Sequence, residues 1–200
     1  MNNLYQELLG RPADPSGLAN YSSQLDKGTG RDMVVREIMG GDEYHTDVVE
    51  QLYLTYLHRP ADPSGLSTGV SFLDHGGTIL QFRAMLLGSG EYFWGRGGGT
   101  NAGFLAALYQ DALGRAVDPS GLAAYSQMLD GGTSRTGVAT EILTSMEGSQ
   151  YRVGMDYQWL LHRGADSNGL GTYGNQLNQG GQEEAIVVTL LSSDEFFGRR

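Results

Sequence analysis

The octapeptide RPADPSGL at residues 11–18 returns unchanged at residues 59–66, and this repetition decides how the chain folds. Two looser copies follow, RAVDPSGL at 115–122 and RGADSNGL at 163–170. Successive copies start 48, 56 and 48 residues apart. Self-similarity at a nearly fixed period of this length is the signature of a repeat protein. The chain therefore holds four copies of one unit.

Apolar residues with helical spacing surround each octapeptide. Positions i, i+3, i+4, i+7 and i+8 form one buried stripe, carried in the second copy by Val49, Leu52, Tyr53, Tyr56 and Leu57. The stripe repeats in the later copies, where Asp156 is its one polar exception. A second and a third apolar helix follow each octapeptide, and no segment alternates like a strand. We expect an all-α protein of four tandem three-helix repeats, with twelve short helices arranged as two similar lobes.

Eight extra residues separate the second and third copies, and they fall around the run GRGGG at 95–99. A run of this composition is typical of a flexible linker. We predict a first lobe at 1–94, a glycine-rich linker at 95–103 and a second lobe at 104–200. The first helix of the first copy lacks a turn, which favours excision from a longer protein over a worn terminal repeat.

Composition excludes several classes of function. The 200 residues carry a net charge of −10, and a phosphate backbone or an anionic membrane surface is bound mainly through clustered Lys and Arg. We expect no nucleic-acid partner. No apolar run approaches the roughly 20 residues that span a bilayer, so we expect no membrane insertion. The first residues do not resemble a secretory signal, and the absence of cysteine excludes disulfides and thiolate sites.

Each octapeptide places an aspartate before proline or serine, where a helix begins. Aspartate at this position accepts hydrogen bonds from free backbone amides, and proline suits the first helical turn. The arginine ends the preceding helix, and a glutamate follows it 32 residues later in every copy. We expect a partly buried Arg–Glu or Arg–Asp pair to tie the helix ends of each repeat together. The members of these sets are Arg11, Asp14, Glu43, Arg59, Asp62, Glu91, Arg115, Asp118, Glu147, Arg163, Asp166 and Glu195.

The repeated acidic residues also suggest calcium, because Asp166 opens a segment that looks like the start of a calcium loop. Position 177, which would supply the late bidentate glutamate of such a loop, is Leu177. We therefore expect capping in place of metal binding and assign no metal site and no cofactor. The same Arg, Asp and Glu set recurs four times, whereas a catalytic site brings unlike residues together once. We expect no enzyme.

Four residues stand out as candidates for binding. Trp159 replaces Glu7, Thr55 and Asp111 at an outward-facing position of the repeat, and exposed tryptophan favours a binding surface. The alternative is that Trp159 covers a neighbouring repeat. Trp94, at the edge of the glycine run, has the same two interpretations. The further candidates are Asp156 and Phe72.

The recurring order of a helix ending in LLGR or YLHR, then ADPSGL, then a tyrosine helix ending in LD, resembles the bacterial repeat family called domain of unknown function 4214. The pattern is also distantly similar to phycobilisome linker domains. The resemblance covers essentially the whole chain. The third copy departs from it at Gly148, and the fourth departs at Gly164 and Ser167. It implies a helical module of large secreted or cell-surface bacterial proteins, and it implies no agreed activity.

Together these features predict a non-catalytic binding or assembly module that recognises a glycan or a protein partner through aromatic side chains. The resemblance implies that this module is extracellular or on the cell surface. Two alternatives stay open. One is a calcium-binding structural module, and the other is a purely structural spacer.

Overall fold

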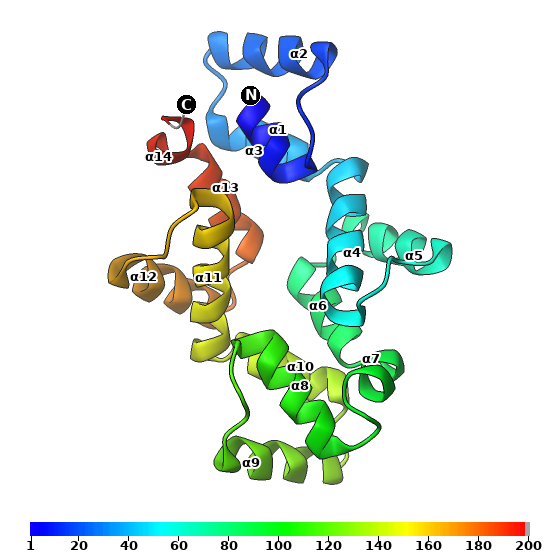
Figure 1. Cartoon of the computed structure of the whole chain (residues 1–200). Helices are drawn as coiled ribbons and strands as arrows, with labels where there is room; N and C mark the ends of the chain where they lie inside the picture. Colours follow the sequence, from blue (N-terminus) through cyan, green and yellow to red (C-terminus); the bar gives the residue numbers. More distant parts are fainter. Residues whose placement is uncertain (199–200) are drawn as a thin grey trace.

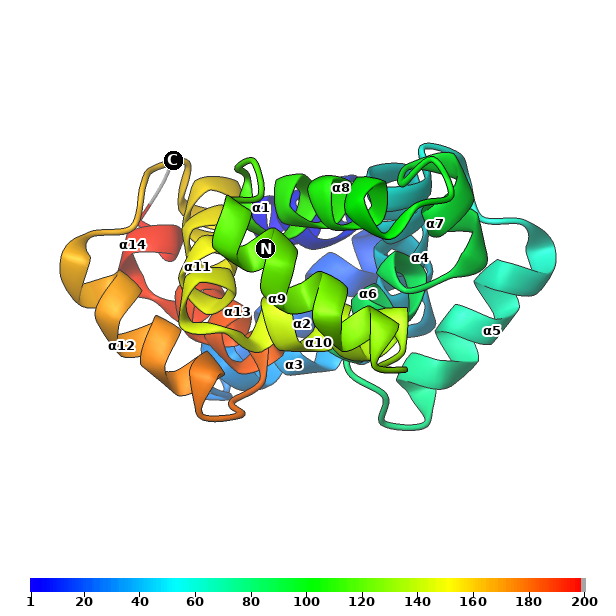
Figure 2. The same cartoon turned by 90° about the horizontal axis from the view of Figure 1, so that it is seen from below.

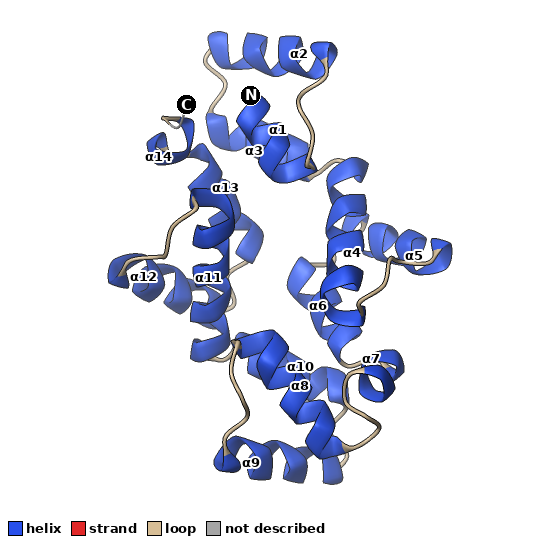
Figure 3. Ribbon diagram, viewed as in Figure 1, coloured by secondary structure: helices blue, strands red, loops and turns tan. Residues whose placement is uncertain are grey.

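The computed structural model describes residues 1–198, which contain fourteen α-helices and no strand (Figure 3). This confirms the all-α prediction. The first repeat contains α1 (Asn2–Leu9), α2 (Pro15–Asp26) and α3 (Arg31–Met39). The second contains α4 (Asp42–Leu57), α5 (Pro63–Asp74), α6 (Ile79–Leu87) and α7 (Gly90–Gly95). The third contains α8 (Asn101–Leu113), α9 (Pro119–Asp130) and α10 (Arg135–Thr144). The fourth contains α11 (Met146–Leu161), α12 (Ser167–Asn178), α13 (Glu183–Ser192) and α14 (Asp194–Phe197).

The four repeats follow one another around a ring (Figure 1). The second helix of each repeat, α2, α5, α9 or α12, lies on the outside of the ring, whereas the other long helices form its wall (Figure 2). The count exceeds the predicted twelve because the short helices α7 and α14 close the second and fourth repeats. None of the helices among residues 1–198 is both long and apolar enough to cross a bilayer.

The octapeptide aspartates cap the outer helices. Asp14 Oδ1 accepts the backbone N–H groups of Ser16 and Gly17 at 3.0 and 2.9 Å. These hydrogen bonds satisfy amides that have no partner inside the helix. The fourth repeat has no proline after its aspartate, yet Asp166 still accepts the N–H of Gly169 at 2.8 Å. Capping therefore survives the loss of the proline.

The glycine of each octapeptide makes room for a tyrosine of the preceding helix. A Cβ atom on Gly17 would lie 2.3 Å from the hydroxyl oxygen of Tyr5, and a Cβ on Gly65 would lie 2.3 Å from that of Tyr53. The third and fourth repeats have the same close approach. The outer helix thus approaches the tyrosine of the wall closely at its first turn, where the glycine has no side chain.

The arginine of each octapeptide makes a two-pronged ion pair with the glutamate 32 residues later. In the first repeat, Nε and Nη2 of Arg11 donate to the two carboxylate oxygens of Glu43 at 2.5 and 2.7 Å. The other pairs are Arg59–Glu91, Arg115–Glu147 and Arg163–Glu195. The arginine side chains are 36–40% exposed. Solvent therefore screens these pairs more than we expected.

Two hydrophobic clusters hold the ring together. One joins repeat 2 to repeat 3 and includes Tyr92 and Phe104, and the other joins repeat 1 to repeat 4 and includes Leu4 and Leu191. Each buried cluster contains residues from both sides of segment 95–103. The division of the chain into two lobes at this segment therefore stays a prediction. The helices α2 and α9 bury no residue fully, so their predicted apolar stripes make only partial contacts.

Repeats 1 and 2 correspond to repeats 3 and 4 by a shift of 104 residues, which gives the ring an approximate two-fold symmetry. The junctions follow this relation. Arg31 lies over the Phe197 ring at 4.3 Å from its centroid, and the equivalent Arg135 lies over Phe93 at 4.4 Å. The first junction also has an ion pair of 2.7 Å between Arg31 and Asp194. Contacts of the same type therefore join the repeats across both halves of the ring.

Candidate functional site

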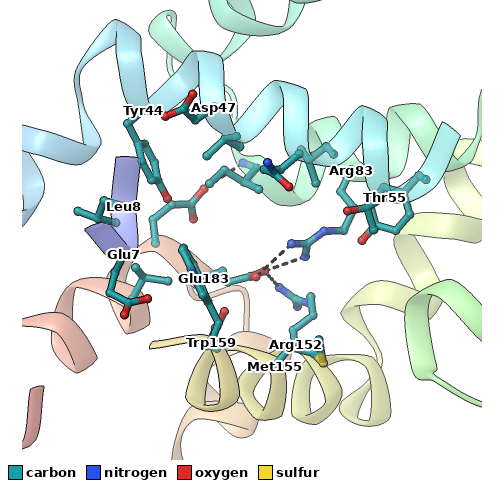
Figure 4. A pocket seen from close by; sticks show the side chains of 18 of the residues that line it. Glu7, Leu8, Tyr44, Asp47, Thr55, Arg83, Arg152, Met155, Trp159 and Glu183 are labelled. Atoms are coloured by element: carbon teal, nitrogen blue, oxygen red, sulfur yellow. Dashed lines mark hydrogen bonds and ion pairs between the residues drawn. The ribbon is translucent and has the colours of Figure 1, made fainter. Parts of the chain in front are cut away.

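A cavity of about 710 Å³ lies inside the ring and is lined by residues of all four repeats (Figure 4). Its walls come from α1, α4, α6, α8, α10, α11 and α13. The outer helices contribute nothing to the lining. The wall helices of each repeat therefore position the site, and the octapeptides position those helices.

One position of the repeat faces this cavity in every copy. Glu7, Thr55, Asp111 and Trp159 all line it. The position is exposed at Trp159, as expected, but it faces the centre of the ring because the four repeats close around it. Trp159 keeps 42% of its surface exposed within this recess, and the neighbouring Met155 keeps 52%.

A buried ionic cluster forms part of the cavity wall. The Nη1 and Nη2 atoms of Arg83 donate to the carboxylate of Glu183 at 3.0 and 3.2 Å. Arg152 donates to the same carboxylate from α11 (Figure 4). One glutamate therefore joins α6, α11 and α13, and two arginines share a single anionic partner.

The charges of this cluster shift the acidity of its members. Burial by itself would raise the pKa of Glu183, but the charges and hydrogen bonds of Arg83 and Arg152 outweigh it and lower the pKa to about 2. Asp156 has no such hydrogen bonds. Its burial, with the charge of Glu183 next in importance, raises its pKa well above the ordinary range.

Several polar atoms around the cluster have no hydrogen-bond partner among residues 1–198. They include Oδ2 of Asp156, Oε2 of Glu184 and the Nε atoms of Arg83 and Arg152. Native proteins leave few buried polar groups without partners, and such groups concentrate where a ligand or water completes the site. The cavity wall is therefore polar and incompletely satisfied.

The two-fold relation within the ring shows that this polarity is not a property of the repeat. Arg83, Arg152, Glu183 and Asp156 correspond to apolar residues in the other half of the chain. These counterparts are Val187, Val48, Ile79 and Leu52. The fold accepts aliphatic side chains at all four positions, so the ionic cluster is an addition to the fold.

Aromatic side chains also line the cavity. Tyr44 and Tyr56 on α4 are 4% and 7% exposed, and Trp159 lies on the opposite wall on α11. Burial, followed by the charges of nearby carboxylates, raises the pKa of the Tyr44 hydroxyl. The Tyr44 hydroxyl is therefore neutral at physiological pH.

The structure separates the predicted binding residues. Trp159 and Asp156 lie one helical turn apart on α11 and both line the cavity. Trp94 is 72% exposed on α7 and lies outside the cavity lining, with its ring edge-on to Phe93. Phe72 packs against Phe82 with ring centroids 6.1 Å apart and belongs to a hydrophobic cluster.

The predicted Arg, Asp and Glu sets lie outside the cavity and hold each repeat together. Their aspartates are the helix caps, and hydrogen bonds from Ser16 and Gly17, the serine side chain first, lower the pKa of Asp14 to about 2. No group of three or more His, Asp or Glu side chains within residues 1–198 is arranged to hold a metal ion.

Our reading of the sequence missed Arg83, Arg152 and Glu183. A signal for them was present, because each puts a charge where the copy 104 residues away has an aliphatic residue. The same comparison had shown Asp156 as the exception in its stripe. Glu184 could have been found in this way too, since its counterpart is Leu80.

Comparison with known proteins identifies a family. The model of the family described as Domain of unknown function (DUF4214) matches residues 1–48, 83–152 and 148–199. No curated protein and no solved structure matches the chain.

Proposed function

The chain belongs to the DUF4214 family, and from that membership and the central cavity we propose that it is a non-catalytic module of a secreted or cell-surface bacterial protein that binds a short glycan. The observation that carries the proposal is the position of Trp159 beside Asp156. An accessible indole and a buried carboxylate oxygen without a partner line the same recess.

The chemistry of the cavity supports a sugar as ligand. A volume of about 710 Å³ is within the range of small-molecule sites. Aromatic rings offer flat apolar faces on which the C–H side of a sugar ring packs. Carboxylate oxygens at Asp47, Asp156 and Glu184 accept hydrogen bonds from sugar hydroxyls. One recess therefore combines the two kinds of contact that a polyhydroxylated ring requires.

The geometry favours a small ligand over a folded protein partner. A stable protein interface buries about 800 Å² on each side, whereas the polar and aromatic residues of this site are recessed inside the ring. The carboxylate of Glu183 is occupied by its ion pairs with Arg83 and Arg152.

The test uses the two tryptophans as separate reporters. Trp94→Phe leaves Trp159 as the one indole, and Trp159→Phe leaves Trp94, which lies outside the cavity. A glycan array on the unmodified chain supplies the ligands, and fluorescence titration follows with each variant. We expect a saturable change in emission for Trp94→Phe and none for Trp159→Phe.

An array without hits, or a response confined to Trp94, contradicts the proposal. Self-association without any ligand supports the spacer alternative. A rise in Tm on adding calcium, with no effect of glycans, supports the calcium module.

A further inference from the structure

Three acidic residues of the cavity lining have no acidic counterpart at the positions related to them by the internal two-fold symmetry. They are Asp47, Asp156 and Glu184, and α4, α11 and α13 contribute one residue each. Their counterparts 104 residues away are Tyr151, Leu52 and Leu80. The repeat therefore does not require carboxylates at these positions.

None of these three carboxyl groups forms an ion pair within residues 1–198, although the charges of Arg83 and Arg152 act on Asp156. Asp47 makes no ion pair with any residue of 1–198, and Asp156 is 5% exposed with no partner at Oδ2. Oε1 of Glu184 accepts the backbone N–H of Ile79 at 2.9 Å, and its Oε2 has no partner.

Other acidic groups of the cavity are already paired. Asp111 accepts the Tyr92 hydroxyl at 2.7 Å and pairs with Arg96 at 3.1 Å. Glu183 forms ion pairs with both arginines of the cavity, Arg83 and Arg152. Nε2 of His162 lies 3.2 Å from Oε1 of Glu7. Arginine side chains thus neutralise Asp111 and Glu183, which leaves Asp47 and Glu184 to attract a cation from outside, while Asp156 offers an unpartnered oxygen to a hydrogen-bond donor.

Trp159 adds a second preference for positive charge. The face of an indole ring attracts a cation through its quadrupole, and sites that recognise ammonium groups combine aromatic rings with carboxylates. Trp159 replaces Thr55 of the related half, so the ring and the carboxylates differ from their counterparts together. Two independent features of the cavity lining therefore favour one kind of ligand group.

We infer that the ligand of the central cavity carries a protonated primary amine, and that it is an amino sugar held between Trp159 and the carboxylates of Asp47, Asp156 and Glu184. This inference rests on the proposed glycan-binding function. It adds that acidic glycans are excluded and that neutral glycans bind more weakly than amino sugars of the same backbone.

Three β-1,4-linked trisaccharides test it, because they differ only in the group at C2 of each ring. Glucosamine trimer carries an amine, N-acetylglucosamine trimer carries an amide, and cellotriose carries a hydroxyl. By titration calorimetry we expect glucosamine trimer to bind at least about tenfold more tightly than the other two, a difference of about 1.4 kcal/mol. Raising the salt concentration should reduce this ratio through screening.

The isosteric variants Asp47→Asn and Glu184→Gln each remove one charge and keep the shape. The glutamine retains an oxygen that accepts the Ile79 amide. We expect each to lower the affinity for glucosamine trimer several-fold and to leave that for cellotriose unchanged. The matched control is Glu141→Gln, which removes one exposed negative charge from α10 outside the cavity and should change neither affinity.

Equal affinity for the three trisaccharides overturns the amine and leaves glycan binding intact. An array hit that lacks an amine has the same meaning. Tighter binding of a lysine peptide than of the amino sugar also overturns it, in favour of a protein partner. Failure of every glycan on the array removes the proposed function itself.

Discussion

Replacing Glu183 with glutamine should cost the chain much of its stability. The side chains of Arg83, Arg152 and Glu183 are 13%, 6% and 10% exposed, so the two arginines would keep their charges with no anionic partner. Breaking a buried pair in this way costs about 3–5 kcal/mol. For a chain of this size each kcal/mol lowers Tm by about 2–4 °C, so we expect a decrease of about 6–20 °C.

Replacing the whole cluster should have the opposite consequence. The fourfold variant carries Arg83→Met, Arg152→Met, Glu183→Leu and Asp156→Leu, which approximate the aliphatic residues of the related half. Buried ion pairs recover little more than their desolvation cost, and well-packed apolar replacements are often neutral or stabilising by about 1–4 kcal/mol. We expect a Tm equal to or above that of the unmodified chain.

Thermal and urea unfolding followed by circular dichroism measure both variants. The control is Glu91→Gln, which breaks a half-exposed ion pair and should lower Tm far less than Glu183→Gln. If Glu183→Gln leaves Tm unchanged, the cluster is not a buried ion pair in solution. If the fourfold variant loses as much stability as the single one, shape rather than charge holds this wall, and the reasoning from the two-fold counterparts fails.

The pH dependence gives an independent check on the same cluster. The folded pKa of Glu183, at about 2, lies below its ordinary value of 4.5. Its stabilising contribution is therefore complete above pH 4.5 and is lost as pH falls from 4.5 toward 2. The fourfold variant should lack this part of the acid sensitivity.

Three further predictions concern single positions. Gly65→Ala should lower Tm because the new Cβ meets the Tyr53 hydroxyl, and adding Tyr53→Phe should restore part of the loss, as thermal unfolding will show. His58→Gly should raise the free energy of unfolding by about 1 kcal/mol in urea titrations, because His58 has φ 54° where Gly10 stands in the first repeat. Asp156→Asn should be increasingly more stable than the unmodified chain as pH rises above 3.8, because burial raises the folded pKa of Asp156 and deprotonation therefore favours the unfolded chain; a constant difference across pH would refute this.

The sequence was sufficient for the helices and their repetition. Local signals specify them, since aspartate before proline caps an outer helix wherever it occurs and apolar spacing marks a buried stripe. The ring was not predictable in the same way. Whether Leu4 packs against repeat 2 or repeat 4 depends on the summed angles between successive repeats, and no single residue determines those angles.

The arrangement of the candidate site could not be predicted for the same reason, because it depends on the closure of the ring. Trp159 stands out from its aligned residues and is exposed, as expected, but the sequence did not show that it faces the central cavity, because that cavity exists only when the ring closes. Arg83 and Glu183 are 100 residues apart in the chain and form a pair only in the closed ring. Their charges could be noticed in the sequence, whereas their contact could not.

The internal repetition separates the residues that build the fold from those that give this chain its particular chemistry. The Arg–Glu pairs, the capping aspartates and the octapeptide glycines recur in every copy. The arginines form the same ion pair in each repeat. Other residues of the cavity occur once, at positions where the related half is aliphatic or small; they are Arg83, Arg152, Asp156, Trp159, Glu183 and Glu184. Buried unpaired carboxylates carry a desolvation cost that aliphatic residues avoid. Residues that cost stability and are absent from the equivalent positions of the same chain are best explained by a ligand, and we therefore assign the function to the cavity and not to the octapeptides.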